Sequence, residues 1–199
     1  MSIRIAAEKD LPRILSIYRP YVENTTVSFE YEVPSDEAFL ARFRGITKQF
    51  PWLVWEENGA VLGYAYACAP FERAAYGWCA EPSIYLAPEA QGRGIGRLLY
   101  ETLEEILICQ GYLLSYAIIT SENEASLAFH RTMGYRETAH FPGCGYKFGR
   151  RLGVIWMEKP LSAVDMPTKE PISFPVFVEN SGKIPAILGK LSLSETEKI

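Results

Sequence analysis

The stretch Glu81-Pro-Ser-Ile-Tyr-Leu-Ala-Pro-Glu-Ala-Gln-Gly-Arg-Gly-Ile-Gly96 contains a short apolar strand, predicted over 83–86, and then a glycine-rich loop. Its three alternate glycines carry no Cβ, so backbone N–H groups can point into one concavity. A helix predicted to begin near Arg97 adds the positive end of its dipole. The loop is therefore predicted to bind a pyrophosphate, with added charge from Arg93 and Arg97.

The spacing of these glycines excludes two common nucleotide motifs. A P-loop requires GxxxxGK[ST], whereas Gly96 is followed by Arg97 and Leu98. A dinucleotide fingerprint requires GxGxxG, and the last position would fall on Arg97 or on Leu99. For the glycines alone, a flexible turn without a ligand remains the alternative.

Outward from this loop, the pattern alternates between strands and helices. Strands are predicted around 3–5, 52–56, 61–69, 114–120, 135–141 and 154–158, with a hairpin turn at Asn58-Gly59. Helices are predicted after Asp10, from Pro34-Ser35, from Arg97 to a stop at Gly111, and from Asn123 or Ser126 to Gly134. The fold class is α/β (α+β), a mixed and mostly antiparallel sheet of six to seven strands flanked by helices.

Composition restricts the class of protein. The chain has 199 residues, 48% of them hydrophobic, and a formal net charge of -4, which argues against a nucleic-acid-binding surface. It contains no apolar run of the ~20 residues that a membrane span needs, and no signal peptide is recognisable. Four cysteines without CxxC spacing and two histidines predict no metal site. We expect a cytoplasmic protein with reduced thiols.

The composition changes near residue 160. Five of the 13 prolines fall at or beyond that position. We therefore predict a domain over 1–160 and a proline-containing C-terminal extension over 161–199, which packs on the domain or on a partner. Within the extension, the β-prone run 176–178 predicts a short edge strand.

The loop fits the Q-x-x-G-x-G pattern of the GNAT superfamily of N-acetyltransferases, which this sequence resembles. A second signature follows at the expected distance, Asn123-x-x-Ser126 and then His130-Arg-Thr-Met-Gly134-Tyr135. The resemblance implies acetyl-CoA as co-substrate. The residues that it places at the cofactor are Tyr85, Leu86, Gln91, Gly92, Arg93, Gly94, Ile95, Gly96, Arg97, Asn123 and Ser126.

Four further segments resemble the phosphinothricin acetyltransferase-like branch of that superfamily. They are residues 21–30 with Pro34, Arg73-Ala-Ala-Tyr76, Glu81, and Gly145-Tyr-Lys-Phe-Gly149. The resemblance covers about 3–159 and implies a small, amino-acid-like amine as acceptor, with Phe29, Arg73 and Tyr76 in its pocket, and a homodimer. The sequence departs from the branch at residues 150–153, Arg-Arg-Leu-Gly, on the acceptor side.

Acetyl transfer requires a neutral amine, and alkyl ammonium groups lose their proton only near pH ~10. Glu81 is the predicted base, and His130 is either the acid that protonates the leaving thiolate or an assisting base. A backbone N–H near Leu86 is expected to meet the oxyanion, where the central strand of the family bulges and splays. We predict direct transfer in a ternary complex.

Two alternatives remain open at this point. A GNAT-fold protein can bind acetyl-CoA as a sensor without turnover, and the intact loop fits that as well. A peptide N-terminal acetyltransferase would have an open groove in place of a closed pocket.

Overall fold

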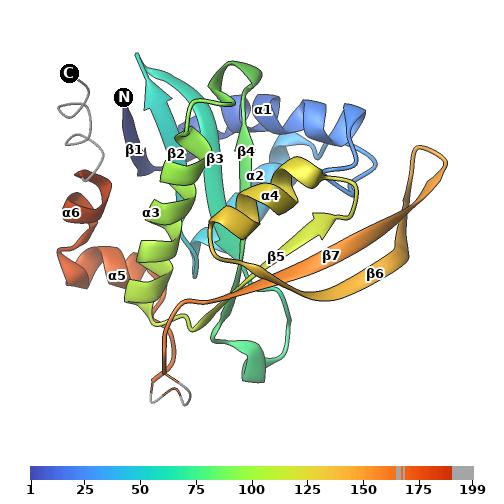
Figure 1. The fold of residues 1–199 in the computed structure, drawn as a ribbon. Helices are drawn as coiled ribbons and strands as arrows, with labels where there is room; N and C mark the ends of the chain where they lie inside the picture. Colours follow the sequence, from blue (N-terminus) through green and yellow to red (C-terminus); the bar gives the residue numbers. More distant parts are fainter. Residues whose placement is uncertain (165–166, 168, 190–199) are drawn as a thin grey trace, which may run out of the picture.

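A seven-stranded sheet organises the computed structural model, which describes residues 1–164, 167 and 169–189 (Figure 1). The strands are β1 (Ser2–Ile5), β2 (Trp52–Glu57), β3 (Ala60–Cys68), β4 (Cys79–Leu86), β5 (Leu114–Thr120), β6 (Arg136–Lys147) and β7 (Arg150–Pro160). Their order is β1-β2-β3-β4-β5-β7-β6, and all neighbours are antiparallel except β4 and β5. The predicted mixed, mostly antiparallel sheet is confirmed.

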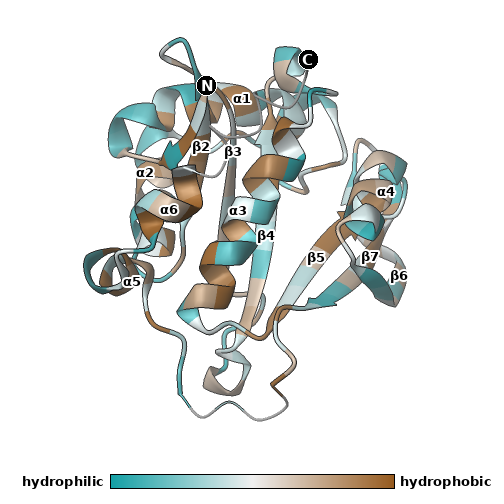
Figure 2. Cartoon of the chain, turned by 60° about the vertical axis from the view of Figure 1, so that its left-hand side comes forward, coloured by the Kyte–Doolittle hydropathy of each residue, from teal (hydrophilic) through white to brown (hydrophobic). Residues whose placement is uncertain are grey.

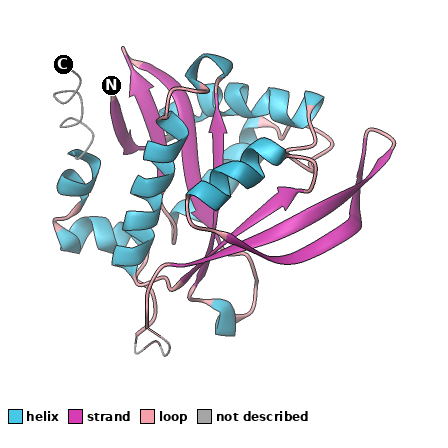
Figure 3. Cartoon of the chain, in the orientation of Figure 1, coloured by secondary structure: helices cyan, strands magenta, loops and turns pink. Residues whose placement is uncertain are grey.

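Helices cover both faces of this sheet (Figure 3). The main ones are α1 (Leu11–Asn24), α2 (Asp36–Thr47), α3 (Ile95–Gln110) and α4 (Glu124–Thr132). α1 and α2 pack on β2 and β3 in a core that includes Ile14, Phe39 and Trp52. α3 covers the opposite face, where Leu99, Leu103 and other apolar residues form a second core. α4 lies beside α3 over β5 and β7.

Several predicted local signals are confirmed. Asn58 and Gly59 both have positive φ, 51° and 78°, as the tight hairpin turn requires. Ser35 caps α2 by accepting a hydrogen bond from the N–H of Ala38. Gly111 ends α3 in the left-handed conformation. Asp10 does precede α1, but its carboxylate binds Arg4 and the Ala7 N–H instead of capping the helix.

The sheet splits in its middle, between β4 and β5. These two strands pair only at Cys79 with Leu114 and at Ala80 with Ser115, and beyond that point they diverge. By contrast, β4 stays in continuous register with β3 from Glu81 to Leu86. The predicted splay is therefore present, but the predicted bulge in this strand is wrong.

The hairpin of β6 and β7 is longer than predicted and projects beyond the rest of the sheet (Figure 3). Its turn is Phe148-Gly149, with φ of 51° and 70°. Eight of the twelve residues of β6 are exposed, and Lys147 is the one buried residue of this strand. A strand that is open on both faces has no apolar alternation, so the pattern could not indicate its full length.

The C-terminal extension packs on the domain through two helices, α5 (Phe174–Ser181) and α6 (Ile184–Gly189). Phe174, Phe177, Ile184 and Ile187 join the core beneath α3, and Figure 2 shows apolar residues along α3 and α6. The strand predicted at 176–178 is wrong, because Pro175 stands in the first turn of a helix, where its missing N–H has no cost. Residues 190–199 of the predicted extension lie outside the described residues.

None of the helices in the described ranges combines the length and the apolar character that a bilayer span needs.

Candidate functional site

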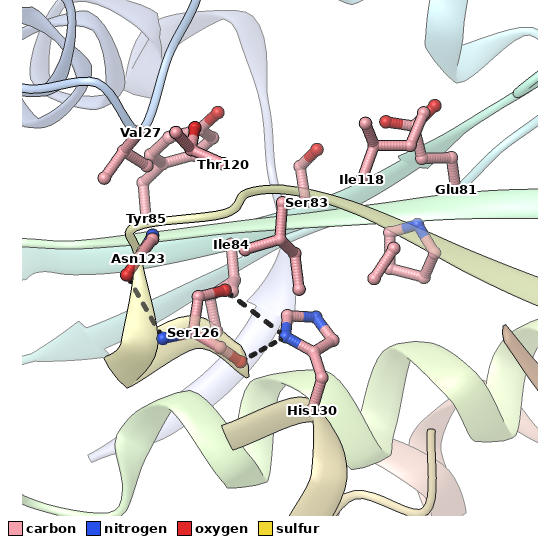
Figure 4. A pocket seen from close by; sticks show the side chains of 13 residues that line it. Val27, Glu81, Ser83, Ile84, Tyr85, Ile118, Thr120, Asn123, Ser126 and His130 are labelled. Atoms are coloured by element: carbon pink, nitrogen blue, oxygen red, sulfur yellow. Dashed lines mark hydrogen bonds between the residues drawn. The ribbon is translucent and has the colours of Figure 1, made fainter. Parts of the chain in front are cut away.

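The split between β4 and β5 forms a cleft at the centre of the molecule. It is lined by residues of β4, β5, α4 and the segment after α1, namely Val27, Glu81, Pro82, Ser83, Ile84, Tyr85, Ala117, Ile118, Ile119, Thr120, Asn123, Ser126 and His130 (Figure 4). Five of the predicted site residues therefore meet here, although they come from segments up to about fifty positions apart.

Backbone groups of β4 face this cleft in an alternating pattern. The Ala87 N–H donates to the Leu62 carbonyl, so the odd-numbered residues of β4 exchange their hydrogen bonds with β3. Pro82, Ile84 and Leu86 therefore turn their backbone groups towards β5. Pro82 has no N–H to leave unpaired there, which explains why proline is tolerated inside this strand.

Glu81 stands where the two strands begin to diverge. Its carboxylate makes no hydrogen bond or ion pair with any of the described residues, and burial raises its pKa to about 7. The side chains of Glu81, Ser83 and Tyr85 point to the α1 face of the sheet, because side chains alternate along a strand. A carboxylate with this pKa is part ionised near neutral pH, as a general base requires.

A second pocket opens on the α1 face and shares Glu81, Ser83 and Tyr85 with the first. Its wall includes Phe29 from the segment after α1, and Tyr66 from β3. The ring of Phe29 lies directly against the backbone of Gly145, where any Cβ would collide with it. Glu81 therefore borders both pockets, which adjoin at the split in the sheet.

Lys147 holds the segment that carries Phe29, a role that the sequence analysis missed. Its side chain is only 2% exposed, and Nζ donates to the carbonyls of Val22, Thr25 and Ser28 at 2.7, 2.8 and 2.6 Å. One ammonium from the end of β6 thus fixes the end of α1 and the start of the following segment. The Gly-Tyr-Lys segment was noted only as a resemblance, and a buried lysine gives no periodic signal.

The glycine loop has the conformation that its sequence predicts. Gly92 and Gly94 have φ of 72° and 78°, and Gly94 precedes α3 without any side-chain cap. The first N–H groups of α3 therefore have no partner within the helix and are available to an anion. The helix begins at Ile95, two residues before the predicted start.

The two arginines of this loop are engaged at the surface. Arg93 pairs with Glu57 at 2.7 Å, and Arg97 pairs with Glu101 at 2.7 Å. Both guanidinium groups are solvent-exposed, so a phosphate group can compete for either at small cost.

Tyr21 connects the loop to the central strand, and it was missed as an individual site residue. Its hydroxyl donates to the Leu86 carbonyl at 2.6 Å and lies 3.4 Å from the Leu86 N–H and 3.2 Å from Gln91 Nε2. Since Tyr21 occupies both backbone groups of Leu86, Ile84 is the β4 residue whose N–H remains directed towards the cleft.

α4 forms the other wall of the cleft. Asn123 caps it by accepting from the Ser126 N–H at 3.2 Å, and His130 lies one turn further on (Figure 4). His130 is 5% exposed, and its Nδ1 lies 2.8 Å from the Ser126 carbonyl. Because a carbonyl only accepts, Nδ1 carries the proton, and Nε2 accepts from the Tyr100 hydroxyl at 3.0 Å.

This geometry gives His130 no proton to donate into the cleft. Both ring nitrogens are directed to protein partners, and burial lowers the pKa of the imidazole, which keeps it neutral. His130 also lies on the α3 face, opposite to Glu81. Of the two predicted catalytic residues, Glu81 is the one whose side chain has no hydrogen-bond partner among the described residues.

Arg73 and Tyr76 are not brought together with Phe29. They lie in the loop between β3 and β4 and line a separate pocket with Trp78, Glu170 and other residues. The Tyr76 ring packs on Phe71, with the ring centroids 4.5 Å apart. Within one chain, the predicted acceptor pocket of Phe29, Arg73 and Tyr76 is thus divided between two places.

No group of three His, Cys, Asp or Glu side chains in the described part of the chain is arranged to hold a metal ion.

Comparison with known proteins identifies the class that this geometry represents. The family profile described as an acetyltransferase (GNAT) domain matches residues 3–156. The chain belongs to the GNAT acetyltransferase family, and it is an acyl-transferring enzyme of that class.

Three relatives show which members of the family this chain is similar to. A phosphinothricin N-acetyltransferase from Alcaligenes faecalis is 38% identical over 82% of this chain and 84% of its own. An L-methionine sulfoximine/L-methionine sulfone acetyltransferase from Pseudomonas paraeruginosa is 39% identical over 79% and 92%. The crystal structure of a phosphinothricin acetyltransferase from Sinorhizobium meliloti in complex with acetyl-CoA has a TM-score of 0.80, 36% identity, and coverage of 87% and 95%.

Proposed function

We propose that this enzyme transfers the acetyl group of acetyl-CoA to the amine of a small, amino-acid-like acceptor. The observation that carries the proposal is the position of Glu81, a half-buried and unpaired carboxylate at the point where the two pockets adjoin. Ser126 and His130 of α4 border one pocket, and Phe29 borders the other. The names of the relatives support acceptors of the phosphinothricin and methionine sulfoximine type.

In the proposed reaction, the pyrophosphate of acetyl-CoA binds at the N–H groups of residues 92–97, and its acyl end reaches the split between β4 and β5. We assign to this cofactor side the residues predicted from sequence, namely Tyr85, Leu86, Gln91, Gly92, Arg93, Gly94, Ile95, Gly96, Arg97, Asn123 and Ser126. Tyr21 joins them through its contacts to Leu86 and Gln91.

Glu81 accepts a proton from the acceptor ammonium, either directly or through one water molecule. The neutral nitrogen then attacks the thioester carbonyl, a C–N bond forms, the C–S bond breaks, and coenzyme A leaves as the thiolate. The second proton, which the nitrogen loses as the amide forms, passes to this thiolate through solvent. The Ile84 N–H is directed to the cleft and is our candidate donor to the oxyanion. No covalent enzyme intermediate is required, and we propose direct transfer in a ternary complex.

We further infer a homodimer in the cytoplasm. The division of Phe29 from Arg73 and Tyr76 within one chain supports a dimer, because a second copy can present its own loop to the first pocket. All four cysteines are free, which is the expected state in a reducing compartment.

The test is release of free thiol from acetyl-CoA by the purified protein, with methionine sulfoximine, phosphinothricin, amino acids, polyamines and an alanine-terminated peptide as acceptors. We expect turnover with an amino-acid-like acceptor. Turnover with the peptide alone would instead support a peptide N-terminal acetyltransferase. Tight binding of acetyl-CoA with no turnover on any acceptor would contradict the proposal and favour a sensor.

A further inference from the structure

A buried chain of polar side chains runs from the cleft through the core of the β5–β7 half of the sheet. It begins at His130 Nε2, 3.0 Å from the Tyr100 hydroxyl, which lies 3.3 Å from the Tyr135 hydroxyl. Tyr135 donates to Glu104 Oε1 at 2.9 Å, and Lys159 Nζ donates to Glu104 Oε2 at 2.6 Å. The chain thus ends in an ion pair between α3 and β7.

This chain joins elements that are distant in sequence. Tyr100 and Glu104 belong to α3, His130 to α4 and Lys159 to β7, and Tyr135 stands just before β6. Ser115 of β5 adds a further contact to the Tyr135 hydroxyl. The surrounding side chains are apolar, including Leu127 and Met157. Polar groups in such a core are costly unless each has a partner, so the chain is built as a unit.

The chain also determines the tautomer of His130. The Ser126 carbonyl requires a proton on Nδ1, so the neutral ring presents an unprotonated Nε2 to Tyr100. The Tyr100 hydroxyl is therefore the donor to Nε2. Because it has one proton, its 3.3 Å contact to the Tyr135 hydroxyl, in which it would also be the donor, is the weaker alternative use of that proton. Neither nitrogen is turned to the cleft.

This connection joins the two elements of the proposed acetyl-CoA site, which we call the cofactor wall: the glycine loop with α3, and α4 with its cap. α3 begins at the glycine loop, and α4 carries Asn123 and Ser126 on its first turn. The rings of Tyr100 and His130 meet edge to face, with centroids 5.3 Å apart. Tyr100 is thus the contact through which the helix of the glycine loop holds the helix of Asn123.

We propose that Tyr100, with Tyr135 and Glu104 behind it, is a positioning residue that acts through His130 to hold α4 at the correct distance from the glycine loop. His130 then contributes to acetyl transfer by fixing the cofactor wall and not by donating a proton. This inference rests on the proposed function only in taking acetyl-CoA as the ligand of that wall.

The test compares Tyr100→Phe with Tyr112→Phe. Tyr112 is an equally buried tyrosine whose hydroxyl accepts from Gln49 Nε2 at 2.9 Å, remote from the cleft, so both variants lose one buried hydrogen bond. We expect Tyr100→Phe to weaken acetyl-CoA binding by about tenfold in calorimetry, the factor that corresponds to one such bond. We expect Tyr112→Phe to bind as the unsubstituted protein does, and acceptor KM to stay constant in both.

Nitrogen-15 NMR of the histidines gives a readout that needs neither ligand nor turnover. The chain has two histidines, so His140→Gln assigns the His130 signals. We expect a neutral ring with Nδ1 protonated, and a shifted Nε2 signal in Tyr100→Phe. A ring protonated at Nε2 would overturn the proposal, as would equal acetyl-CoA affinity in the two tyrosine variants.

These outcomes separate the two proposals. If acetyl-CoA does not bind at all, the proposed function fails, and the NMR signals still decide whether the chain fixes His130. A shift of the basic limb of the kcat–pH profile in Tyr100→Phe would assign His130 to proton transfer and contradict the positioning role.

Discussion

On the α3 face of the split sheet, the proposed cofactor side comprises the glycine loop at the start of α3 and the first turns of α4, which lines the cleft through Asn123, Ser126 and His130. We call this the first wall. On the α1 face, the wall is residues 25–31, which form neither helix nor strand, with the ring of Phe29 against Gly145. The first wall is held by backbone conformation and by the Tyr100–His130 contact. The second is held by the ammonium of Lys147, from a strand more than a hundred residues away, and by hydrogen bonds from Thr120 to the Thr26 carbonyl and between Tyr18 and Ser28.

From this difference we infer that acetyl-CoA and the acceptor amine bind to separate parts of the molecule. Substitutions on the first wall should change the affinity for acetyl-CoA, and those on the second should change acceptor KM. Glu81 lies between the walls and should affect kcat alone.

Glu81→Gln should have the largest effect, because it removes the base and leaves both walls intact. We expect kcat to fall by about 10² to 10⁴, with the dissociation constant of acetyl-CoA unchanged. Steady-state kinetics and calorimetry measure the two quantities. Glu23→Gln, at an exposed carboxylate of α1, is the control and should have no effect.

The dependence of kcat on pH is a second test of Glu81 as the base. Glu81 must be ionised to accept a proton, and burial raises its pKa to about 7, so kcat should rise with pH through that value. The acidic limb should disappear in Glu81→Gln. A profile that is flat from pH 6 to pH 8 in the unsubstituted enzyme would contradict Glu81 as the base.

Lys147→Met should affect the second wall. It leaves three buried carbonyls without a donor, which we expect to lower the free energy of unfolding by about 3 kcal/mol. With the segment 25–31 loosened, acceptor KM should rise by about tenfold, whereas acetyl-CoA affinity should hold. Denaturant titration measures the loss of stability, and steady-state kinetics measures the acceptor KM. An equal loss of affinity for acetyl-CoA and the acceptor would contradict the separation of the two walls.

Gly94→Ala should affect the first wall. A side chain at φ 78° costs about 1–2 kcal/mol, so the loop will distort and acetyl-CoA should bind about tenfold more weakly. Gly59→Ala is a matched control, because Gly59 has the same φ of 78° and also has open space around it. It should lose similar stability in thermal unfolding while acetyl-CoA affinity stays constant.

Arg97→Gln should have the smallest effect. The guanidinium is exposed and already paired with Glu101, so we expect acetyl-CoA to bind only about twofold to threefold more weakly. The difference should vanish at high salt, where exposed charges are screened. A tenfold loss that persists at high salt would mean that side-chain charge matters more to this wall than the backbone does.

The first wall could be predicted from sequence because its signals are local. Gln91 to Gly96, Asn123 and Ser126 each act within one turn of chain, and the structure places them as their spacing indicates. The sheet could be predicted for the same reason, from the Asn58-Gly59 turn and the apolar periods of its buried strands.

The second wall could not be predicted, because its contacts join distant segments. Nothing near Lys147 indicates that it will bind carbonyls at the end of α1, and nothing near Arg73 indicates that it will lie away from Phe29. The helix at 174–181 was missed for a related reason. Val176, Phe177 and Val178 favour a strand locally, but burial of Phe174 and Phe177 against the core beneath α3 decides for a helix.

The two residue pairs that join β4 to β5 have a consequence for stability. Beyond Ala80, β4 lacks the backbone hydrogen bonds to β5 that the other neighbouring strands form with each other. A ligand that carries amide groups can form such bonds with the backbone of Ile84. Occupancy of the cleft is then linked to folding: at a concentration of 100 times its dissociation constant, such a ligand adds about 2.7 kcal/mol. The cellular level of the acyl donor would in this way govern how long the enzyme survives, as well as how fast it works.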